Sequence, residues 1–200
     1  MSPKRPPSHH RTRPAGRVRL IGGRLKRSVI EVLDSPGLRP TPDRVRETLF
    51  NWLAFELAGI RVFDPFAGSG ALGFEAISRG AAKALMIERD RRVAGLLRDN
   101  ARRLGIGEQI EVREADALIQ LARTPDEPYD LVFLDPPFHQ GLAAEAAALL
   151  ERHGWLTERA LIYLECESSL ATPVPANWEA LRDTRAGETQ ARLYRRAPTG

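Results

Sequence analysis

The feature that most constrains the fold is a regular alternation of strand-like and helix-like runs that begins at residue 60. Short apolar runs rich in β-branched and aromatic residues, such as Tyr129 to Leu134, are followed by runs with helical spacing, such as Leu142 to Arg152. Strands that alternate with helices form parallel sheets, because each helix crosses a face of the sheet and returns the chain to the same edge. The sequence therefore predicts an α/β domain with helices on both faces of a mostly parallel sheet.

The runs can be placed along the chain. The expected strands cover residues 60–64, 84–88, 110–113, 129–134 and 160–165, and the expected helices cover 71–79, 90–104, 117–123 and 142–152. Runs over 178–183 and 190–196 then flank Gly187 with no helix between them, which predicts a C-terminal antiparallel hairpin. The whole is a Rossmann-like, mostly parallel sheet of seven strands.

The segment before residue 41 has a different character. Residues 18–21 and 28–33 read as short strands around Gly22-Gly23, which predicts a basic N-terminal β-hairpin. Thr41 is expected to cap the next helix, with Pro42 at its first position. The expected division of the chain is a disordered basic tail over residues 1–17, a hairpin and linker over 18–40, and one main domain over 41–200.

Charge is unevenly distributed along the chain. Residues 1–30 hold nine of the 30 Lys and Arg residues and no acid, whereas the remaining chain holds 21 basic and 26 acidic residues. Such a block favours binding to a polyanion, because each cation that meets a phosphate releases condensed counterions. Nucleic acid is the leading partner. Two other interpretations are a solvated tail that only aids solubility and a transit peptide, for which no amphipathic apolar face is present.

Composition narrows the class of protein further. An apolar content of 42% with 28% charged residues is typical of a soluble globular domain, and no run approaches the roughly 18 apolar residues of a membrane helix. The single cysteine, Cys166, fits a reducing compartment and is interpreted as a buried strand residue. The four histidines lack metal-ligand spacing. We expect a cytoplasmic monomer that binds no membrane and no metal.

Polar residues follow the predicted strands where ligands bind in such sheets, at the carboxyl ends. The run DPFAGSGALG after the first parallel strand begins with Asp64 and contains a glycine loop that a ligand can approach closely. Glu88 ends the next strand, where it can accept hydrogen bonds from a ribose diol, and Asp116 follows the third, within reach of a base. These positions fit an adenosine-containing ligand. A nicotinamide dinucleotide is a weaker alternative, because Asp64 would repel its pyrophosphate.

The fourth parallel strand ends in the sequence LDPPF. Asp135 and the carbonyls before and within the two prolines form rigid acceptors, because the prolines restrict the backbone. Phe138 offers a flat face on which a base can stack. Such a pocket suits an exocyclic amine on a heterocycle. The alternative is a strand terminator with a core aromatic ring, which leaves Asp135 unexplained.

The stretches VRLIGGRLKR, LRPTPDRVRETLFNWL, DPFAGSGALGFEAISRGA, MIERD, EADA and FLDPPF together resemble a known family. Their order and content are similar to class I S-adenosylmethionine-dependent methyltransferases, and most closely to bacterial small-subunit (16S) ribosomal RNA guanine-N2 methyltransferases of the RsmD type. The resemblance covers about residues 18 to 138. It implies S-adenosylmethionine as cofactor, ribosomal RNA or the small ribosomal subunit as partner, and N2-methylation of a specific guanine.

The resemblance also assigns residues. Those implied to hold the cofactor are Thr41, Asp64, Phe66, Gly68, Ser69, Gly70, Glu88, Asp116 and Ala117. Those implied to hold the guanine are Asp135, Pro136 and Phe138. Those expected to bind RNA are Arg17, Arg19, Arg24, Lys26, Arg27, Arg39 and Arg44. Arg46 would lie near either the cofactor carboxylate or the RNA.

Two other activities remain open at this point. An N6-adenine methyltransferase on DNA or RNA shares the D-P-P-F type of motif, although it usually has Asn and Tyr there. A non-catalytic RNA-binding protein could keep the basic arm and a vestigial site.

Overall fold

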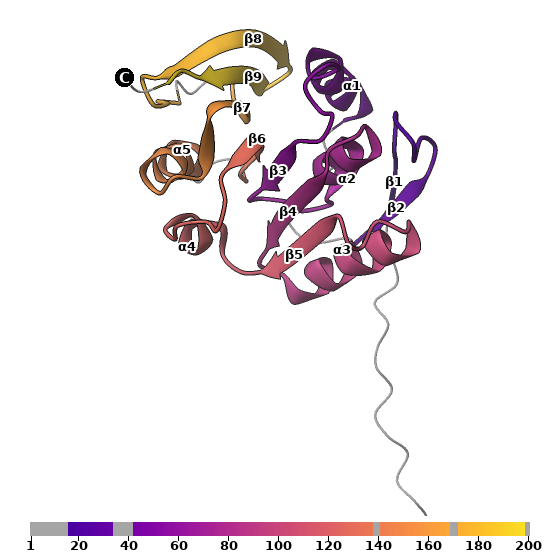
Figure 1. The fold of residues 1–200 in the computed structure, drawn as a ribbon. Helices are drawn as coiled ribbons and strands as arrows, with labels where there is room; N and C mark the ends of the chain where they lie inside the picture. Colours follow the sequence, from indigo (N-terminus) through magenta and orange to yellow (C-terminus); the bar gives the residue numbers. More distant parts are fainter. Residues whose placement is uncertain (1–15, 34–41, 138–140, 169–171, 199–200) are drawn as a thin grey trace, which may run out of the picture.

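The structure is a computed structural model of the 200-residue chain and describes residues 16–33, 42–137, 141–168 and 172–198. A seven-stranded sheet forms its centre (Figure 1). Its strands are β3 (Arg61–Asp64), β4 (Lys83–Glu88), β5 (Ile110–Glu114), β6 (Tyr129–Leu134), β7 (Leu156–Glu167), β8 (Trp178–Ala186) and β9 (Thr189–Arg196). Their order is β5-β4-β3-β6-β7-β9-β8, with β3 to β7 parallel and β9 antiparallel to β7 and β8. The predicted sheet and C-terminal hairpin are confirmed.

Five helices cover the two faces of this sheet. They are α1 (Asp43–Trp52), α2 (Ala71–Ser78), α3 (Arg91–Arg103), α4 (Ala117–Leu121) and α5 (Leu142–Arg152). Figure 1 shows α1, α2 and α3 on one side and α4 and α5 on the other. Alternate residues of each strand point to opposite faces, so β6 places Phe133 in the core with α1 and α2 and Val132 in the core with α5.

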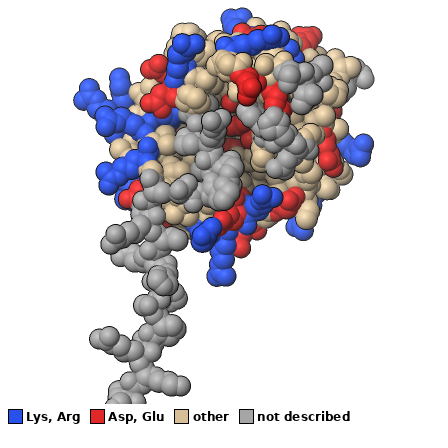
Figure 2. Space-filling view, turned by 180° about the vertical axis from the view of Figure 1, so that it is seen from behind, with Lys and Arg blue, Asp and Glu red and all other residues tan. Residues whose placement is uncertain are grey.

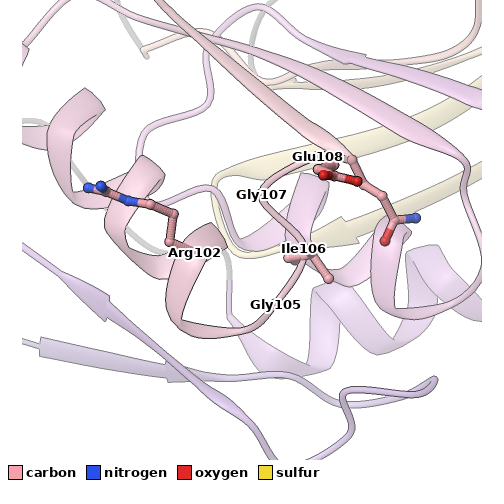
Figure 3. Close-up of a pocket in the computed structure, with 6 residues that line it drawn as sticks. Arg102, Gly105, Ile106, Gly107 and Glu108 are labelled. Atoms are coloured by element: carbon pink, nitrogen blue, oxygen red, sulfur yellow. The ribbon is translucent and has the colours of Figure 1, made fainter.

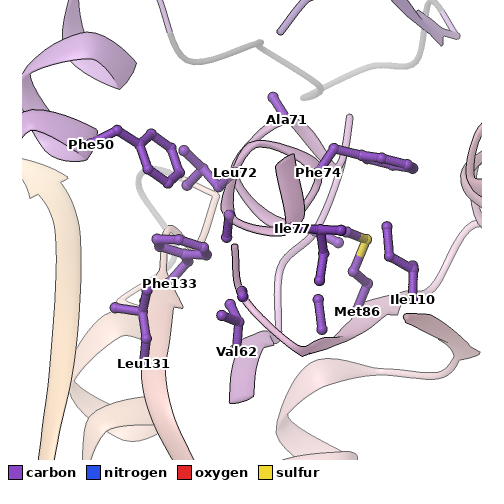
Figure 4. Packing of buried hydrophobic residues seen from close by; sticks show 14 of the residues in the cluster. Phe50, Val62, Ala71, Leu72, Phe74, Ile77, Met86, Ile110, Leu131 and Phe133 are labelled. Atoms are coloured by element: carbon purple, nitrogen blue, oxygen red, sulfur yellow. The ribbon is translucent and has the colours of Figure 1, made fainter. Parts of the chain in front are cut away.

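The larger core surrounds α2. Its eight residues are all buried, because the helix lies between the sheet, α1 and the N-terminal hairpin. Figure 4 shows Phe50 of α1 directed toward Phe133 of β6, and their ring centroids are 6.0 Å apart. The second core contains a stack of Phe63 on Trp155, with centroids 4.4 Å apart. Trp155 therefore packs in the core, and Cys166 is buried in β7, as expected.

The N-terminal hairpin forms a separate two-stranded sheet of β1 (Gly16–Arg19) and β2 (Val29–Val32), paired antiparallel. The predicted hairpin is confirmed, but its first strand starts at Gly16, so the last two residues of the expected tail belong to it. Residues 1–15 and the linker over 34–41 lie outside the described part of the chain. The division into tail, hairpin and main domain otherwise stays a prediction.

The starts of α1 and β7 differ from the expectation for identifiable reasons. Helix α1 starts at Asp43, and Pro42 occupies the capping position with an extended ψ of 144° instead of the first helical position. Strand β7 starts at Leu156, four residues earlier than predicted, because Leu156 already pairs with Tyr129 of β6. Within the described residues, no helix is long and apolar enough to cross a membrane. The same residues contain no group of three or more His, Cys, Asp or Glu side chains that could hold a metal ion.

Contacts with α2 fix the hairpin on the main domain. The Glu75 carboxylate accepts the backbone N–H groups of Ile21 and Gly22 at 2.8 and 2.7 Å. Ser78 donates its hydroxyl to the Gly22 carbonyl at 2.6 Å and accepts the Leu25 N–H at 3.0 Å. The hairpin therefore docks on the C-terminal half of the helix.

Candidate active site

The site lies where the strand order reverses. The chain runs from β3 outward to β4 and β5, and then returns to place β6 on the other side of β3. In open α/β sheets, ligands bind at such a switch point, outside the carboxyl ends of the strands. Asp64 ends β3, and Asp135 follows β6 directly. The two carboxylates that the sequence singled out therefore lie at the ends of adjacent strands, and we call this edge of the sheet the crevice.

The glycine loop joins β3 to α2 with left-handed backbone at Gly68 (φ 50°) and Gly70 (φ 76°). A Cβ atom at Gly70 would stand 2.5 Å from Leu97 Cδ2 and 2.9 Å from Phe74, so the position has no room for a side chain. The Ala67 N–H donates to the Ile87 carbonyl at 3.1 Å and the Gly70 N–H to the Ala67 carbonyl at 2.7 Å. The loop is therefore tightly built, and it leads directly into α2 at Ala71.

Asp64 is almost completely buried at the base of this loop. Burial raises the pKa of its carboxyl group from 3.8 to about 7, while the Phe66 and Gly73 N–H groups lower it and the charge of nearby Glu88 raises it further. A carboxylate so poorly solvated is stabilised by a cation. The ammonium and sulfonium charges of S-adenosylmethionine fit that requirement, whereas a pyrophosphate does not.

Glu88 stands at the end of β4, one strand away from Asp64. Burial raises the pKa of its carboxyl group, and the backbone N–H of Asp90 lowers it. That N–H donates to Glu88 Oε1 at 2.8 Å, which fixes the side chain at the end of the strand. The geometry suits a ribose diol.

Asp116 has a second use in the structure. It caps α4, because Oδ1 accepts the N–H groups of Leu118 and Ile119 at 2.9 and 3.1 Å. The cap does not use Oδ2, and the next residue, Ala117, is half-buried. Phe66 and Ser69 are half-buried in the glycine loop, where the Ser69 hydroxyl accepts the Ala71 N–H at 3.3 Å.

The LDPPF segment delivers Asp135 and Pro136 to the crevice after β6. Asp135 is half-buried and Pro136 is buried, whereas Pro137 is exposed. Asp135 lies close enough to Tyr163 of β7 for its charge to raise the pKa of the Tyr163 hydroxyl, after the larger effect of burial. Phe138, Thr41 and Arg39 lie outside the described residues, so their assigned roles stay predictions.

Basic side chains gather around the hairpin. The exposed residues there are Arg17, Arg19, Arg24, Lys26 and Arg27, joined by Arg44 of α1. Figure 2, seen from behind, shows basic side chains on the side where the hairpin lies and acidic side chains near the middle of the face. A hollow lined by Arg19, Lys26, Arg27, Asp43 and Glu47 separates the hairpin from α1. This is the surface expected to meet RNA.

Sequence reasoning did not predict the burial of Arg46 and missed Glu75. Arg46 was expected near the cofactor or the RNA, but its side chain is fully buried. Its Nη2 donates to the Arg19 carbonyl at 3.0 Å and to Asp43 at 2.6 Å, and Nη1 lies 4.0 Å from Glu75. The reason is helical spacing: Arg46 shares the inward face of α1 with Phe50. The sequence signal that could have pointed to Glu75 is an acidic residue in an otherwise apolar helical run.

Another hollow lies away from this site. Figure 3 shows Arg102, Gly105, Ile106, Gly107 and Glu108 around it, in the turn between α3 and β5. This turn precedes β5 and therefore lies at the amino end of the parallel strands. It is not part of the crevice that holds Asp64 and Asp135.

The strand order, the reversed β9, the glycine loop after β3 and the acids after β4 and β6 define a class I methyltransferase fold. A family model described as "Conserved hypothetical protein 95" matches residues 18–195. The chain belongs to this family, which includes ribosomal RNA small subunit methyltransferase D.

Similarity to relatives extends over nearly the whole chain. It is 49% identical to ribosomal RNA small subunit methyltransferase D of Escherichia coli K12 over 187 residues, which cover 93% of each protein. It is 45% identical to the protein of the same name from Haemophilus influenzae over 181 residues, 90% of this chain and 94% of the relative. The solved structure of yhhF from Escherichia coli has a TM-score of 0.84 and 47% identity, and covers 92% of this chain and 100% of that one.

Proposed function

We propose that the protein methylates N2 of a specific guanine in small-subunit (16S) ribosomal RNA, with S-adenosylmethionine as methyl donor. The observation that carries this proposal is the placement of Asp135 and Pro136 beside the Asp64 loop at the switch point of the sheet. The names of the relatives support the substrate class. Such a substrate would place the protein in the cytoplasm.

The residues that contact the cofactor would come from the ends of three strands. Asp64, with the loop over Gly68 to Gly70, would hold the methionyl part, and Glu88 Oε2 would accept from the ribose hydroxyls. Asp116 Oδ2 and Ala117 would face the adenine. S-adenosylmethionine, when bound, supplies a methyl group that is already electrophilic because it is carried on a sulfonium sulfur. The protein therefore contributes mainly position and electrostatics.

Asp135 and the Pro136 carbonyl would hold the target amine. Guanine N2 is a weak nucleophile, because its electron pair is delocalised into the ring. Hydrogen bonds from its N–H groups to these acceptors favour the pyramidal, reactive amine. Asp135 would also take the proton that N2 releases once its electron pair has formed the bond to the methyl carbon. Phe138 would stack on the base, which must be unpaired or extruded to enter.

The basic hairpin would bind the RNA backbone. Its cations are exposed, and the hairpin docks on α2, the helix that begins at the cofactor loop. Phosphate contacts of this kind orient a nucleic acid without reading its sequence. Choice of the base would therefore rest on the pocket at the strand ends.

The test is methyl transfer from labelled S-adenosylmethionine to small ribosomal subunits, protein-free ribosomal RNA and duplex DNA, followed by nucleoside analysis. We expect label in N2-methylguanosine in one of the two RNA substrates. Label in N6-methyladenosine would favour the adenine methyltransferase alternative. Tight cofactor binding with no transfer to any substrate would contradict the proposed substrate, and failure to bind S-adenosylmethionine would favour a non-catalytic RNA-binding protein.

A further inference from the structure

Strand β7 places a second carboxylate, that of Glu165, next to the position of Asp135 after β6. The two strands run parallel, with Phe133 paired to Tyr163 and Leu134 to Leu164. The next residues in this register are Asp135 and Glu165. Neighbouring strands are about 4.8 Å apart, so side chains at equivalent positions can reach the same edge of one base.

Glu165 faces the same side of the sheet as Tyr163. The two residues are separated by one position in β7, and the Tyr163 hydroxyl donates to Glu165 Oε2 at 2.9 Å. Tyr163 lies edge-on to Phe133, with ring centroids 6.4 Å apart, in the core that α1 covers. Asp135 is two residues after Phe133, and its charge acts on the Tyr163 hydroxyl. Asp135, Tyr163 and Glu165 therefore form one polar group beside the carboxyl end of β6.

This polar group requires an explanation. The Glu165 side chain belongs to a residue that is only 6% exposed, and Tyr163 is fully buried. A buried carboxylate is costly unless its oxygens are hydrogen-bonded. The hydrogen bond from Tyr163 engages Oε2 and leaves Oε1 as an acceptor. An interior strand position that served packing alone would be apolar. Ile162 and Leu164, which pack on the opposite face of β7, are examples.

We propose that Glu165 is a specificity residue, whose carboxylate accepts the N1–H of the target guanine while Asp135 and the Pro136 carbonyl accept from N2. This inference rests on the proposed function and deepens it. Guanine presents N1–H and N2–H as adjacent donors on its Watson–Crick edge, which an extruded base exposes to its pocket. Adenine presents an acceptor at N1. A carboxylate at this place would therefore favour guanine and repel adenine.

Tyr163 is the positioning residue in this arrangement. Burial raises the pKa of the Glu165 carboxyl group, and the hydrogen bond from Tyr163 fixes the side chain and opposes part of that rise. An ionised carboxylate can only accept, which is what N1–H requires. Tyr163 touches the base only through Glu165.

The experiment compares guanine with 2-aminopurine at the methylated nucleotide of reconstituted small subunits. 2-Aminopurine keeps the reactive amine but has an acceptor at N1. Wild type should methylate guanine about 10- to 100-fold faster than 2-aminopurine, because 2-aminopurine offers no hydrogen-bond donor to the Glu165 carboxylate. Glu165→Gln should lose about as much on guanine, while its rate on 2-aminopurine is kept or raised, because the amide can donate to N1.

Controls separate this result from a loss of structure. Glu158→Gln makes the same change at an exposed position of β7 and should leave both rates unchanged. Tyr163→Phe keeps the Glu165 carboxylate but removes the hydrogen bond that fixes it. This variant should show a smaller preference for guanine, with no increase in the methylation rate of 2-aminopurine. Each variant should bind S-adenosylmethionine as wild type does.

The outcomes are distinct. A Glu165→Gln variant that keeps the guanine preference, or loses both substrates equally, overturns the inference while wild-type N2-methylguanosine still supports the proposed function. Methylation of adenine by wild type would overturn both. A preference that moves from guanine toward 2-aminopurine supports Glu165 as the group that reads N1.

Discussion

The Glu75 carboxylate of α2 accepts the backbone N–H of Gly22 at 2.7 Å, although the Glu75 side chain is wholly buried. The same carboxylate accepts from Arg79 at 2.7 Å and lies 4.0 Å from Arg46. Helix α2 begins at Ala71, directly after the glycine loop, and ends beside the hairpin. One helix therefore joins the cofactor site to the proposed RNA-binding surface.

Replacing Glu75 with Gln should destabilise the protein by about 2 to 4 kcal/mol. The amide keeps one acceptor but turns an N–H group toward the donors of Ile21 or Gly22. It also leaves the exposed Asp43 as the remaining acidic partner of the buried Arg46, whose Nε and Nη1 already lack hydrogen-bond partners within the described part of the chain. Urea unfolding measures the change.

The matched control for this prediction is Glu47→Gln on the exposed side of α1. It should change the free energy of unfolding by no more than about 0.5 kcal/mol. A loss below about 1 kcal/mol for Glu75→Gln would contradict the role assigned to the buried carboxylate.

Gly70→Ala should be more damaging than Gly59→Ala. Both glycines have left-handed backbone, with φ of 76° and 73°, so both substitutions pay the cost of about 1 to 2 kcal/mol for that conformation. A Cβ at Gly59 meets nothing within 4 Å, whereas at Gly70 it meets Leu97 at 2.5 Å. We expect an additional loss of about 1 to 3 kcal/mol and weaker cofactor binding for Gly70→Ala alone. Equal losses would show that the loop is not tightly packed.

Cofactor affinity should rise with pH below neutrality. The pKa of Asp64 is about 7 in the folded protein, so its ionised fraction grows about five-fold between pH 6 and pH 7. A cationic ligand binds the ionised form, and the ligand's own amino group stays protonated in this range, since its pKa is about 7.7. Calorimetric titration should therefore give an affinity about five-fold higher at pH 7.

Asp64→Asn should abolish this pH dependence and bind the cofactor weakly at both pH values. Stability should respond in the opposite direction. The folded pKa of Asp64 exceeds its ordinary value of 3.8, so wild type loses stability as pH rises from about 4 to 7, and the variant lacks this component. An unchanged pH dependence in the variant would assign the titration to another group, such as Glu88.

Removal of three hairpin cations should reduce the salt dependence of RNA binding. Each lost phosphate contact makes the slope of log affinity against log salt less negative by about 0.7 to 0.9, so replacing Arg24, Lys26 and Arg27 with Ala should change it by about 2 to 3. The control replaces the exposed Arg123, Arg152 and Arg159, which lie around the amino ends of the strands. An equal effect in both triple variants would mean that binding is general electrostatics rather than a property of the hairpin.

The sequence was a good guide to the sheet and to the residues at the strand ends. Periodicity predicts which runs become strands, and parallel topology then brings Asp64, Glu88 and Asp135 to one edge whatever the details of packing. Helix α5 and strand β6 have the predicted bounds, because each is closed by a clear turn signal.

What could not be predicted depends on contacts between distant residues. Glu75 and Arg46 resemble solvent-facing helix residues until the hairpin is known to pack on α2 and α1. The Tyr163 and Glu165 pair acquires meaning only from the register of β7 against β6, which the sequence does not specify. The additional cap formed by Asp116 likewise follows from the exact start of α4.

We propose above that the protein methylates guanine N2 in small-subunit ribosomal RNA and that Asp135 holds the target amine. The most direct measurement is mass spectrometry of nucleosides from small-subunit RNA of cells that lack this protein, complemented with wild type or with Asp135→Ala. We predict one N2-methylguanosine that is absent from the deletion, restored by wild type and not restored by the variant. N2-methylguanosine that is unchanged by the deletion, or fully restored by Asp135→Ala, would contradict the account.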